Sequence, residues 1–291
     1  GRRRDRRHRP DSPAVPAGPQ SEAFEEAARS GEIVYQEDYT VGEGESAWNT
    51  DLVVGPPMPD EDFQIGLGDR PIAEAEPSEI WLAIDAKSVM TEHGKARRNR
   101  QRDINSFADI MHRHHPGAIA GGVLLINMAD RFRSPLRDEG DITKHDNIEQ
   151  LVSDTVDIFR DIDRAEGDIS SNVDGVACVV VEHTNLDDNH GSRLVTEEPA
   201  PQEGDITNYR EFLDIIVETL EERFLLGEPP EIVREQRKEE LRKELNAEIV
   251  ELAYLARKVG KDVSETDSED IEEFRETLET TESVLAEIES I

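Results

Sequence analysis

Two charged residues, Asp85 and Lys87, directly follow an apolar run and are the first candidates for chemistry in this sequence. The run from Ile80 to Ile84 is rich in large and branched residues, which is typical of a strand buried on both faces. Because side chains alternate along a strand, Asp85 and Lys87 are predicted to share one face at its C-terminal end. Burying a carboxylate and an ammonium is costly, which favours a chemical role for the pair.

A carboxylate beside a lysine is suited to metal-assisted hydrolysis of a phosphodiester bond. A hard divalent cation such as Mg²⁺ prefers carboxylate oxygens, and a nearby lysine can hold or help deprotonate the attacking water. Such a site needs a second carboxylate, and Asp51, which opens the apolar run 51–55, is the preferred candidate. Asp60 and Asp62, in the proline-containing segment that follows, are alternatives for this first acid. The structural alternative is a surface salt bridge between Asp85 and Lys87 at the end of a strand.

This order of residues resembles the PD-(D/E)xK nuclease superfamily, whose members share the restriction-endonuclease-like fold. The resemblance spans residues 21–226 in element order, and its specific motif is Asp51, Asp85 and Lys87, with Asp at position 85 where the family more often has Glu. It implies a deoxyribonuclease in which Asp51, Asp85 and the carbonyl group of Ala86 bind Mg²⁺, or Mn²⁺ in its place. Lys87 would then orient the attacking water.

The helix that precedes the sheet in this superfamily often lends the metal a further carboxylate. The segment 21–30 is predicted to be a short helix starting at Ser21, and Glu26 is the preferred ligand among its acids, with Glu22 and Glu25 as alternatives. The resemblance most often implies restriction or another role in genome defence, and DNA repair or recombination is the second context.

A basic segment without any acid follows the Asp85–Lys87 pair. It begins a predicted helix that runs to about His114, and its cations are Lys95, Arg97, Arg98, Arg100 and Arg102. Because affinity for nucleic acid comes largely from Lys and Arg contacts to phosphates, these residues are the candidate DNA-binding surface. The alternative is a solvated helix face.

The composition of the whole chain is strongly acidic, with a formal net charge of −34 over 291 residues. Only seven of the 33 basic residues are lysine, and this lysine-poor, acid-rich composition resembles that of proteins from salt-loving archaea, in which acidity maintains solubility. Cys178 is the single cysteine, which excludes a disulfide framework and a cysteine-based zinc site. The sequence has no signal peptide and no apolar stretch of membrane-spanning length, so we expect a cytoplasmic protein without a membrane partner.

Composition and periodicity predict three parts. Residues 1–20 are arginine- and proline-rich and are predicted to form a disordered basic tail. Residues 21–228 are predicted to form the nuclease-like α/β core, in which the segment from Asp146 to Glu149 has the pattern of a capping box before a helix. Beyond Pro229, residues 229–291 are predicted to form an αα-hairpin that packs on the core or pairs with a second chain as a homodimer.

The predicted fold class is therefore α/β, with a restriction-endonuclease-like central mixed β-sheet flanked by helices and a C-terminal helical hairpin. No phosphate-binding glycine loop, zinc-protease helix motif or nucleophile elbow is present in the sequence. The leading functional expectation is a metal-dependent DNA endonuclease. The alternative is a non-catalytic nucleic-acid-binding or scaffold protein with a degenerate nuclease fold.

Overall fold

The computed structural model divides into two compact units, Gly1–Gly227 and Glu228–Ile291. The described residues are 21–42, 47–59, 63, 72–135, 138, 141–165, 171–186, 191–226 and 231–259, with scattered positions between 274 and 288. The predicted tail, residues 1–20, lies outside the described residues, and so do the alternative acids Asp60 and Asp62. Nothing in the described part therefore bears on those three predictions.

The first unit is built on a seven-stranded sheet with the order β3-β1-β2-β4-β5-β8-β9. The β1/β2, β2/β4 and β8/β9 pairs are antiparallel, whereas β1/β3, β4/β5 and β5/β8 are parallel. The α/β class and the mixed sheet predicted from the sequence are thus confirmed. The strands are β1 (Val34–Val41), β2 (Trp48–Gly55), β3 (Ala73–Glu74), β4 (Leu82–Val89), β5 (Ile119–Asn127), β8 (Gly175–Glu182) and β9 (Arg193–Leu194).

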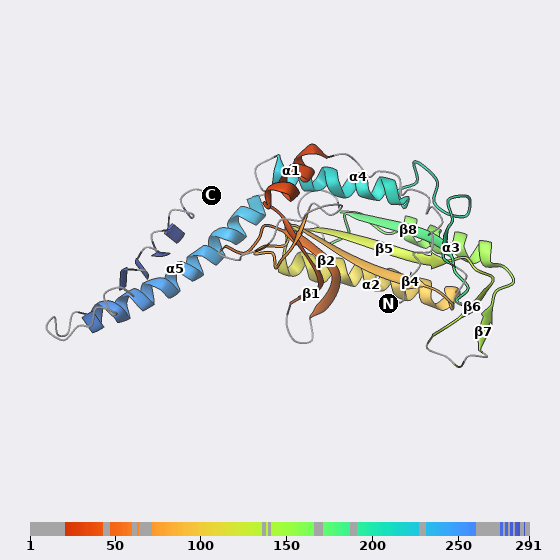
Figure 1. The fold of residues 1–291 in the computed structure, drawn as a ribbon, viewed down its shortest axis with the longest axis horizontal. Coiled ribbons are helices and arrows are strands. Elements are labelled where there is room, and N and C mark those ends of the chain that lie inside the picture. The colour runs from red at the N-terminus through yellow and green to blue at the C-terminus, as the bar shows by residue number, and fades with distance from the viewer. Residues whose placement is uncertain are drawn as a thin grey trace, which may run out of the picture. The chain divides into compact units, whose positions relative to one another are not determined.

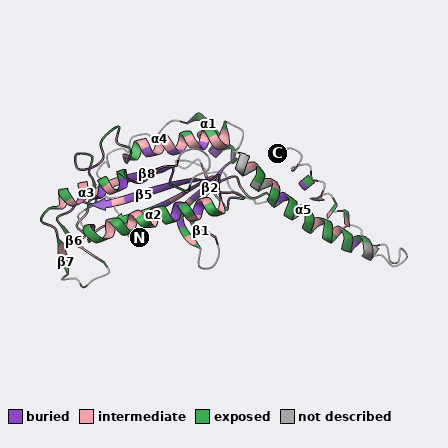
Figure 2. Cartoon of the chain, turned by 180° about the vertical axis from the view of Figure 1, so that it is seen from behind, coloured by how far each residue is buried: buried purple, intermediate pink, exposed green. Residues whose placement is uncertain are grey.

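Helices cover both faces of this sheet (Figure 1). One face packs against α1 (Glu22–Ser30), α4 (Tyr209–Leu220) and the π-helical turn η2 (Glu221–Leu225), and the other packs against α2 (His93–His114) and α3 (Ile148–Arg160). The central strands are buried from both sides because their apolar residues alternate between the two cores (Figure 2). On β4, Ala83 and Val89 belong to the core under α2, whereas Leu82 belongs to the core under α4.

The N-terminus of α1 is capped by a side chain as the sequence predicts, whereas the N-terminus of α3 is not. The hydroxyl group of Ser21 accepts a hydrogen bond from the Phe24 amide at 2.9 Å and donates one to Glu221, which ties the start of α1 to η2. The capping box predicted from Asp146 to Glu149 is wrong. The N-cap of α3 is Asn147, whose side chain makes no capping hydrogen bond, and the buried residues of the helix hold it instead.

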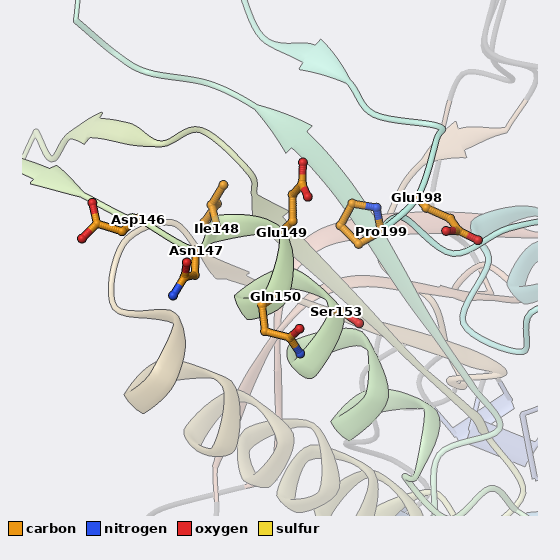
Figure 3. A pocket seen from close by; sticks show the side chains of 8 residues that line it. All are labelled: Asp146, Asn147, Ile148, Glu149, Gln150, Ser153, Glu198 and Pro199. Carbon is orange, nitrogen blue, oxygen red and sulfur yellow. The ribbon is translucent and has the colours of Figure 1, made fainter.

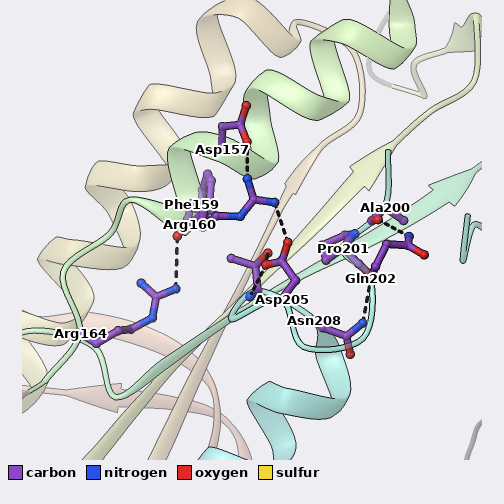
Figure 4. A network of polar contacts seen from close by, with 10 residues as sticks. Asp157, Phe159, Arg160, Arg164, Ala200, Pro201, Gln202, Asp205 and Asn208 are labelled. Carbon is purple, nitrogen blue, oxygen red and sulfur yellow. Dashed lines mark hydrogen bonds and ion pairs between the residues drawn. The ribbon is translucent and has the colours of Figure 1, made fainter. Parts of the chain in front are cut away.

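The segment between β9 and α4 is fixed by polar contacts at the end of α3 (Figure 4). The Arg160 guanidinium donates to Asp205 at 2.6 Å and also to Asp157, and Asp205 in turn accepts from the Thr207 hydroxyl group at 2.7 Å. The Asn208 side-chain amide donates to the Pro201 carbonyl at 2.9 Å. These contacts hold the segment on the sheet, where Val195 and Ala200 are part of the core.

A small two-stranded ribbon and a long helix complete the described structure. The ribbon consists of β6 (Arg131–Arg133) and β7 (Ile142–Lys144), which follow β5. In the second unit, α5 (Glu231–Val259) buries Leu241 and Leu255. Among the described helices, none is long and apolar enough to cross a membrane.

Candidate active site

The candidate site lies where the sheet forks between β2 and β4. The β2/β4 ladder ends at the Leu52–Ile84 pair, while β4 continues along β5 as far as Val89 opposite Ile126. Strand β2 continues along β1 to Trp48, so the β1–β2 hairpin separates from β4 beyond Ile84. The prediction that Asp85 lies at the end of a strand is wrong in this detail. Pairing with β5 extends the strand past the apolar run, and the site lies within β4.

Asp85 and Lys87 form a direct ion pair on one face of β4. The Lys87 ammonium lies 2.6 Å from the Asp85 Oδ1 atom, with the Asp85 side chain fully buried and the Lys87 side chain 20% exposed. The two residues share their face with Ala83 and Val89, as strand alternation predicts, and this is the face covered by α2. The predicted convergence of the carboxylate and the ammonium is confirmed.

The Asp85 carboxylate has one satisfied oxygen and one without a partner. Oδ1 accepts hydrogen bonds from Lys87 and from the Trp48 indole N–H at 3.3 Å, whereas Oδ2 is buried without any partner among the described residues. Burial raises the pKa of Asp85, and the nearby charge of Asp51 raises it further. Lys87 and Trp48 act in the opposite direction and lower this pKa. An unpaired buried oxygen is costly, so this site is destabilised as it stands.

Asp51 lies beside Asp85 across the fork. In the antiparallel register Asp51 and Asp85 are the next residues after the last Leu52–Ile84 pair. The Asp51 Oδ2 atom accepts a hydrogen bond from the Ala86 amide at 2.6 Å, so this side chain satisfies an amide group on β4 just past the end of the β2/β4 ladder. The structure therefore brings Asp51, Asp85, Ala86 and Lys87 together, as the sequence predicted.

This group of atoms fits a hard divalent cation. The unpaired Asp85 Oδ2 atom is a buried carboxylate oxygen, which is the type of ligand that Mg²⁺ and Mn²⁺ prefer. Asp51, opposite Asp85 in the strand register, supplies a second carboxylate whose charge acts on Asp85. No group of three or more His, Cys, Asp or Glu side chains suited to a metal occurs within the described ranges. The remaining ligands would then be backbone oxygens and water, as is usual for Mg²⁺.

Glu26 has no observed connection to this site. It is exposed on α1, whose buried residues Ala27 and Ala28 belong to the core on the face opposite Asp85. In the part of the chain that the structure describes, no contact links Glu26 to Asp51 or Asp85.

The basic segment of α2 divides into two groups. Arg97 forms an ion pair with Asp154 of α3 at 2.9 Å, and Arg100 pairs with Asp103 at 2.8 Å and donates to the Ser88 carbonyl at 3.2 Å. These two arginines hold α2 against its neighbours. Lys95, Arg98 and Arg102 are exposed, and within the described residues they form no ion pair. Their spacing of three and four places them on one stripe of the helix.

Buried polar residues anchor the start of α2 near the site. The His93 ring contacts the carbonyl oxygens of Thr91 and Asn127 at 2.9 and 2.7 Å. The Asn127 side chain donates to the His183 carbonyl at 2.9 Å and accepts from the His183 amide at 3.1 Å, which joins the ends of β5 and β8. Sequence reasoning missed these residues and Trp48, because each acts through a partner that is distant in sequence.

A separate cavity of about 900 Å³ lies at the start of α3, facing Glu198 and Pro199 (Figure 3). Its lining includes the carboxylates of Asp146, Glu149 and Glu198, a composition that disfavours an anionic substrate. The cavity includes none of the residues of the fork between β2 and β4.

Comparison of the chain with protein-family models, with curated proteins and with solved structures found no match in any of the three.

Proposed function

We propose that this protein is a metal-dependent endonuclease that hydrolyses DNA phosphodiester bonds. The observation that carries the proposal is the buried, unpaired Oδ2 atom of Asp85, a residue that pairs with Lys87 on its own strand and stands opposite Asp51 in the register of the neighbouring strand. A bare carboxylate oxygen in a buried position costs stability, and a bound cation removes that cost.

The arrangement of elements supports a restriction-endonuclease-like fold for the core. The order α1, β1, β2, β4, α2, β5 combines an antiparallel β1–β2–β4 meander with a parallel β4/β5 pair joined by a helix. The acids and the lysine lie on β2 and β4 of this arrangement, where the resemblance to the PD-(D/E)xK superfamily expects them.

Each residue of the fork has a role in the proposed reaction. Asp51 and Asp85 would hold Mg²⁺ or Mn²⁺, with the Ala86 carbonyl as an additional ligand. Bound there, the cation would lower the pKa of a coordinated water and stabilise charge on the phosphate. Lys87, which is partly exposed, donates hydrogen bonds and would orient the attacking water while offsetting negative charge.

The exposed stripe of Lys95, Arg98 and Arg102 supports DNA as the partner. It lies on the helix that directly follows β4, and it is a local concentration of positive charge in a chain with a net charge of −34. A polyanionic ligand would be recognised by such a stripe even where the overall charge repels it. Restriction or another form of genome defence is the proposed context, with DNA repair or recombination second.

The second unit supports a further proposal, that the chain pairs with another copy of itself. Within α5, the neighbouring apolar side chains of Ile249, Val250 and Tyr254 are 49%, 69% and 61% exposed, and clustered exposed apolar side chains are typical of interaction surfaces. Sedimentation of the wild type and of Val250→Glu tests this pairing. A monomer in both cases would contradict it.

Plasmid cleavage tests the nuclease proposal. Supercoiled DNA is incubated in high KCl with Mg²⁺, Mn²⁺ or EDTA and with the wild type, Asp85→Ala or Lys87→Ala. The controls Asp109→Ala and Lys144→Ala remove an exposed acid and an exposed lysine outside the fork. We expect metal-dependent nicking or cutting by the wild type and by both controls, and loss of cleavage in both site variants.

Cleavage that persists in EDTA, or in both site variants, would contradict this assignment. Absence of cleavage over a broad range of salts and DNA substrates, with DNA binding intact, would favour the alternative of a non-catalytic binding protein.

A further inference from the structure

The Trp48 indole contacts both members of the Asp85–Lys87 pair. Its N–H donates to the Asp85 Oδ1 atom at 3.3 Å, and the Lys87 ammonium lies 5.5 Å from the centre of its ring. Trp48 belongs to the part of β2 that has separated from β4, so its side chain reaches back across the fork. It is the one residue of that part of β2 for which a contact with both charged groups is observed.

We propose that Trp48 is a positioning residue that decides which oxygen of Asp85 faces the cation. Its N–H and the Lys87 ammonium both occupy Oδ1, which leaves Oδ2 as the free ligand atom. The face of its ring also attracts the ammonium and keeps it beside the same carboxylate. This inference rests on the metal-dependent reaction proposed above.

A packing role alone does not account for this arrangement. Phe or Leu would also bury apolar surface at this half-buried position against the core, but neither has a side-chain N–H group. The hydrogen bond to a buried carboxylate is charge-assisted and specifies the orientation of its acceptor. Both donors converge on one oxygen while the other has none, and this asymmetry is what a monodentate metal ligand requires.

Two substitutions separate the N–H from the ring. Trp48→Phe removes the hydrogen bond and keeps an aromatic face, and Trp48→Leu removes both. Because a hydrogen bond to a charged group is lost, we expect Trp48→Phe to lower kcat by about 10- to 100-fold with little change in KM for DNA. Trp48→Leu should lose about threefold more activity because the aromatic face is also removed. Trp81→Phe, which changes the residue just before β4, should retain full activity.

The second measurement, tryptophan fluorescence, detects Mn²⁺ binding at the site without DNA cleavage. Trp48 and Trp81 are the two tryptophans of the chain, so Trp81→Phe leaves Trp48 as the sole indole. Paramagnetic Mn²⁺ bound beside it should quench its fluorescence in a saturable way. Asp85→Asn in the same background should raise the Mn²⁺ concentration that gives half-maximal quenching at least tenfold. This measurement uses the native Trp48 and does not depend on the folding of the position-48 variants.

The outcomes separate this inference from the proposed function. Saturable quenching that depends on Asp85, without DNA cleavage, would support the placement of Trp48 and contradict the nuclease. Metal-dependent cleavage that is unchanged in a folded Trp48→Phe variant would support the nuclease and overturn the role of Trp48. Absence of Asp85-dependent quenching in an active enzyme would also overturn it.

Discussion

The exposed basic stripe of α2 gives a prediction with a defined magnitude. Lys95→Gln, Arg98→Gln and Arg102→Gln together remove the three exposed cations of the stripe. Arg97 and Arg100 stay in place because their contacts with Asp154 of α3 and with the Ser88 carbonyl of β4 hold α2 on the fold. Surface substitutions away from such contacts usually change stability by no more than about 0.5 kcal/mol, so the triple variant should remain folded.

The expected effect follows from counterion release. Each phosphate contact to duplex DNA contributes about 0.9 to the slope of log K against log salt concentration, so loss of three contacts lowers the slope by about 2.7. Each doubling of the salt concentration should then weaken DNA binding by the wild type about sixfold more than binding by the variant. The sequence of the DNA should not matter, since phosphates carry no sequence information.

Fluorescence anisotropy with a labelled duplex over a salt series measures this slope. A matched control, Arg29→Gln with Arg113→Gln and Arg193→Gln, removes the same charge from arginines that pair with neighbouring acids. The control should retain the wild-type slope to within about 1. An equal decrease of the slope in the control and in the stripe variant, or a wild-type slope in the stripe variant, would refute the assignment of the stripe to DNA binding.

Three further predictions concern stability. Because burial raises the pKa of Asp85 in the folded state, the ionised carboxylate lowers the stability of the fold at neutral pH. Asp85→Asn should therefore raise Tm in metal-free buffer at pH 7, and a lower Tm would contradict this. Burial and the neighbouring His114 lower the pKa of His115 from 6.5 to about 4. The free energy of unfolding should therefore fall by up to about 3 kcal/mol as the pH drops from 6.5 to about 4. Urea titrations should show that His115→Gln removes this contribution to the pH dependence. A Cβ on Gly55 would lie 1.8 Å from the Glu79 carbonyl oxygen, whereas one on Gly94 meets open space. Gly55→Ala should therefore cost more than about 3 kcal/mol and Gly94→Ala should be neutral or stabilising by up to about 1 kcal/mol, and equal effects in thermal unfolding would refute the contrast.

Local sequence was sufficient to predict the elements that build the site. The apolar runs that contain Leu82 and Ile119 became neighbouring parallel strands, joined by the predicted helix α2. Strand periodicity placed Asp85 and Lys87 on one face, because alternation of side chains is a property of the backbone alone.

The contacts that make the site unusual were not predictable in this way. Trp48 meets Asp85 only because β2 separates from β4, and the Arg97–Asp154 ion pair joins residues 57 positions apart. Such pairs depend on how the strands and helices pack, and nothing in the local pattern of either residue encodes them. The basic segment therefore looked like one uniform surface in the sequence, whereas packing ties Arg97 to Asp154 of α3 and Arg100 to the Ser88 carbonyl of β4.

The proposed function depends on a divalent cation that Asp51 and Asp85 would bind at the fork between β2 and β4. A crystal structure of the wild type grown with Mn²⁺, with an anomalous difference map that locates the Mn²⁺, tests this binding. We expect an anomalous peak in contact with the Asp85 Oδ2 atom and with the Asp51 carboxylate, and no such peak in Asp85→Asn. A peak elsewhere, or an empty fork at a saturating concentration of Mn²⁺, would contradict it.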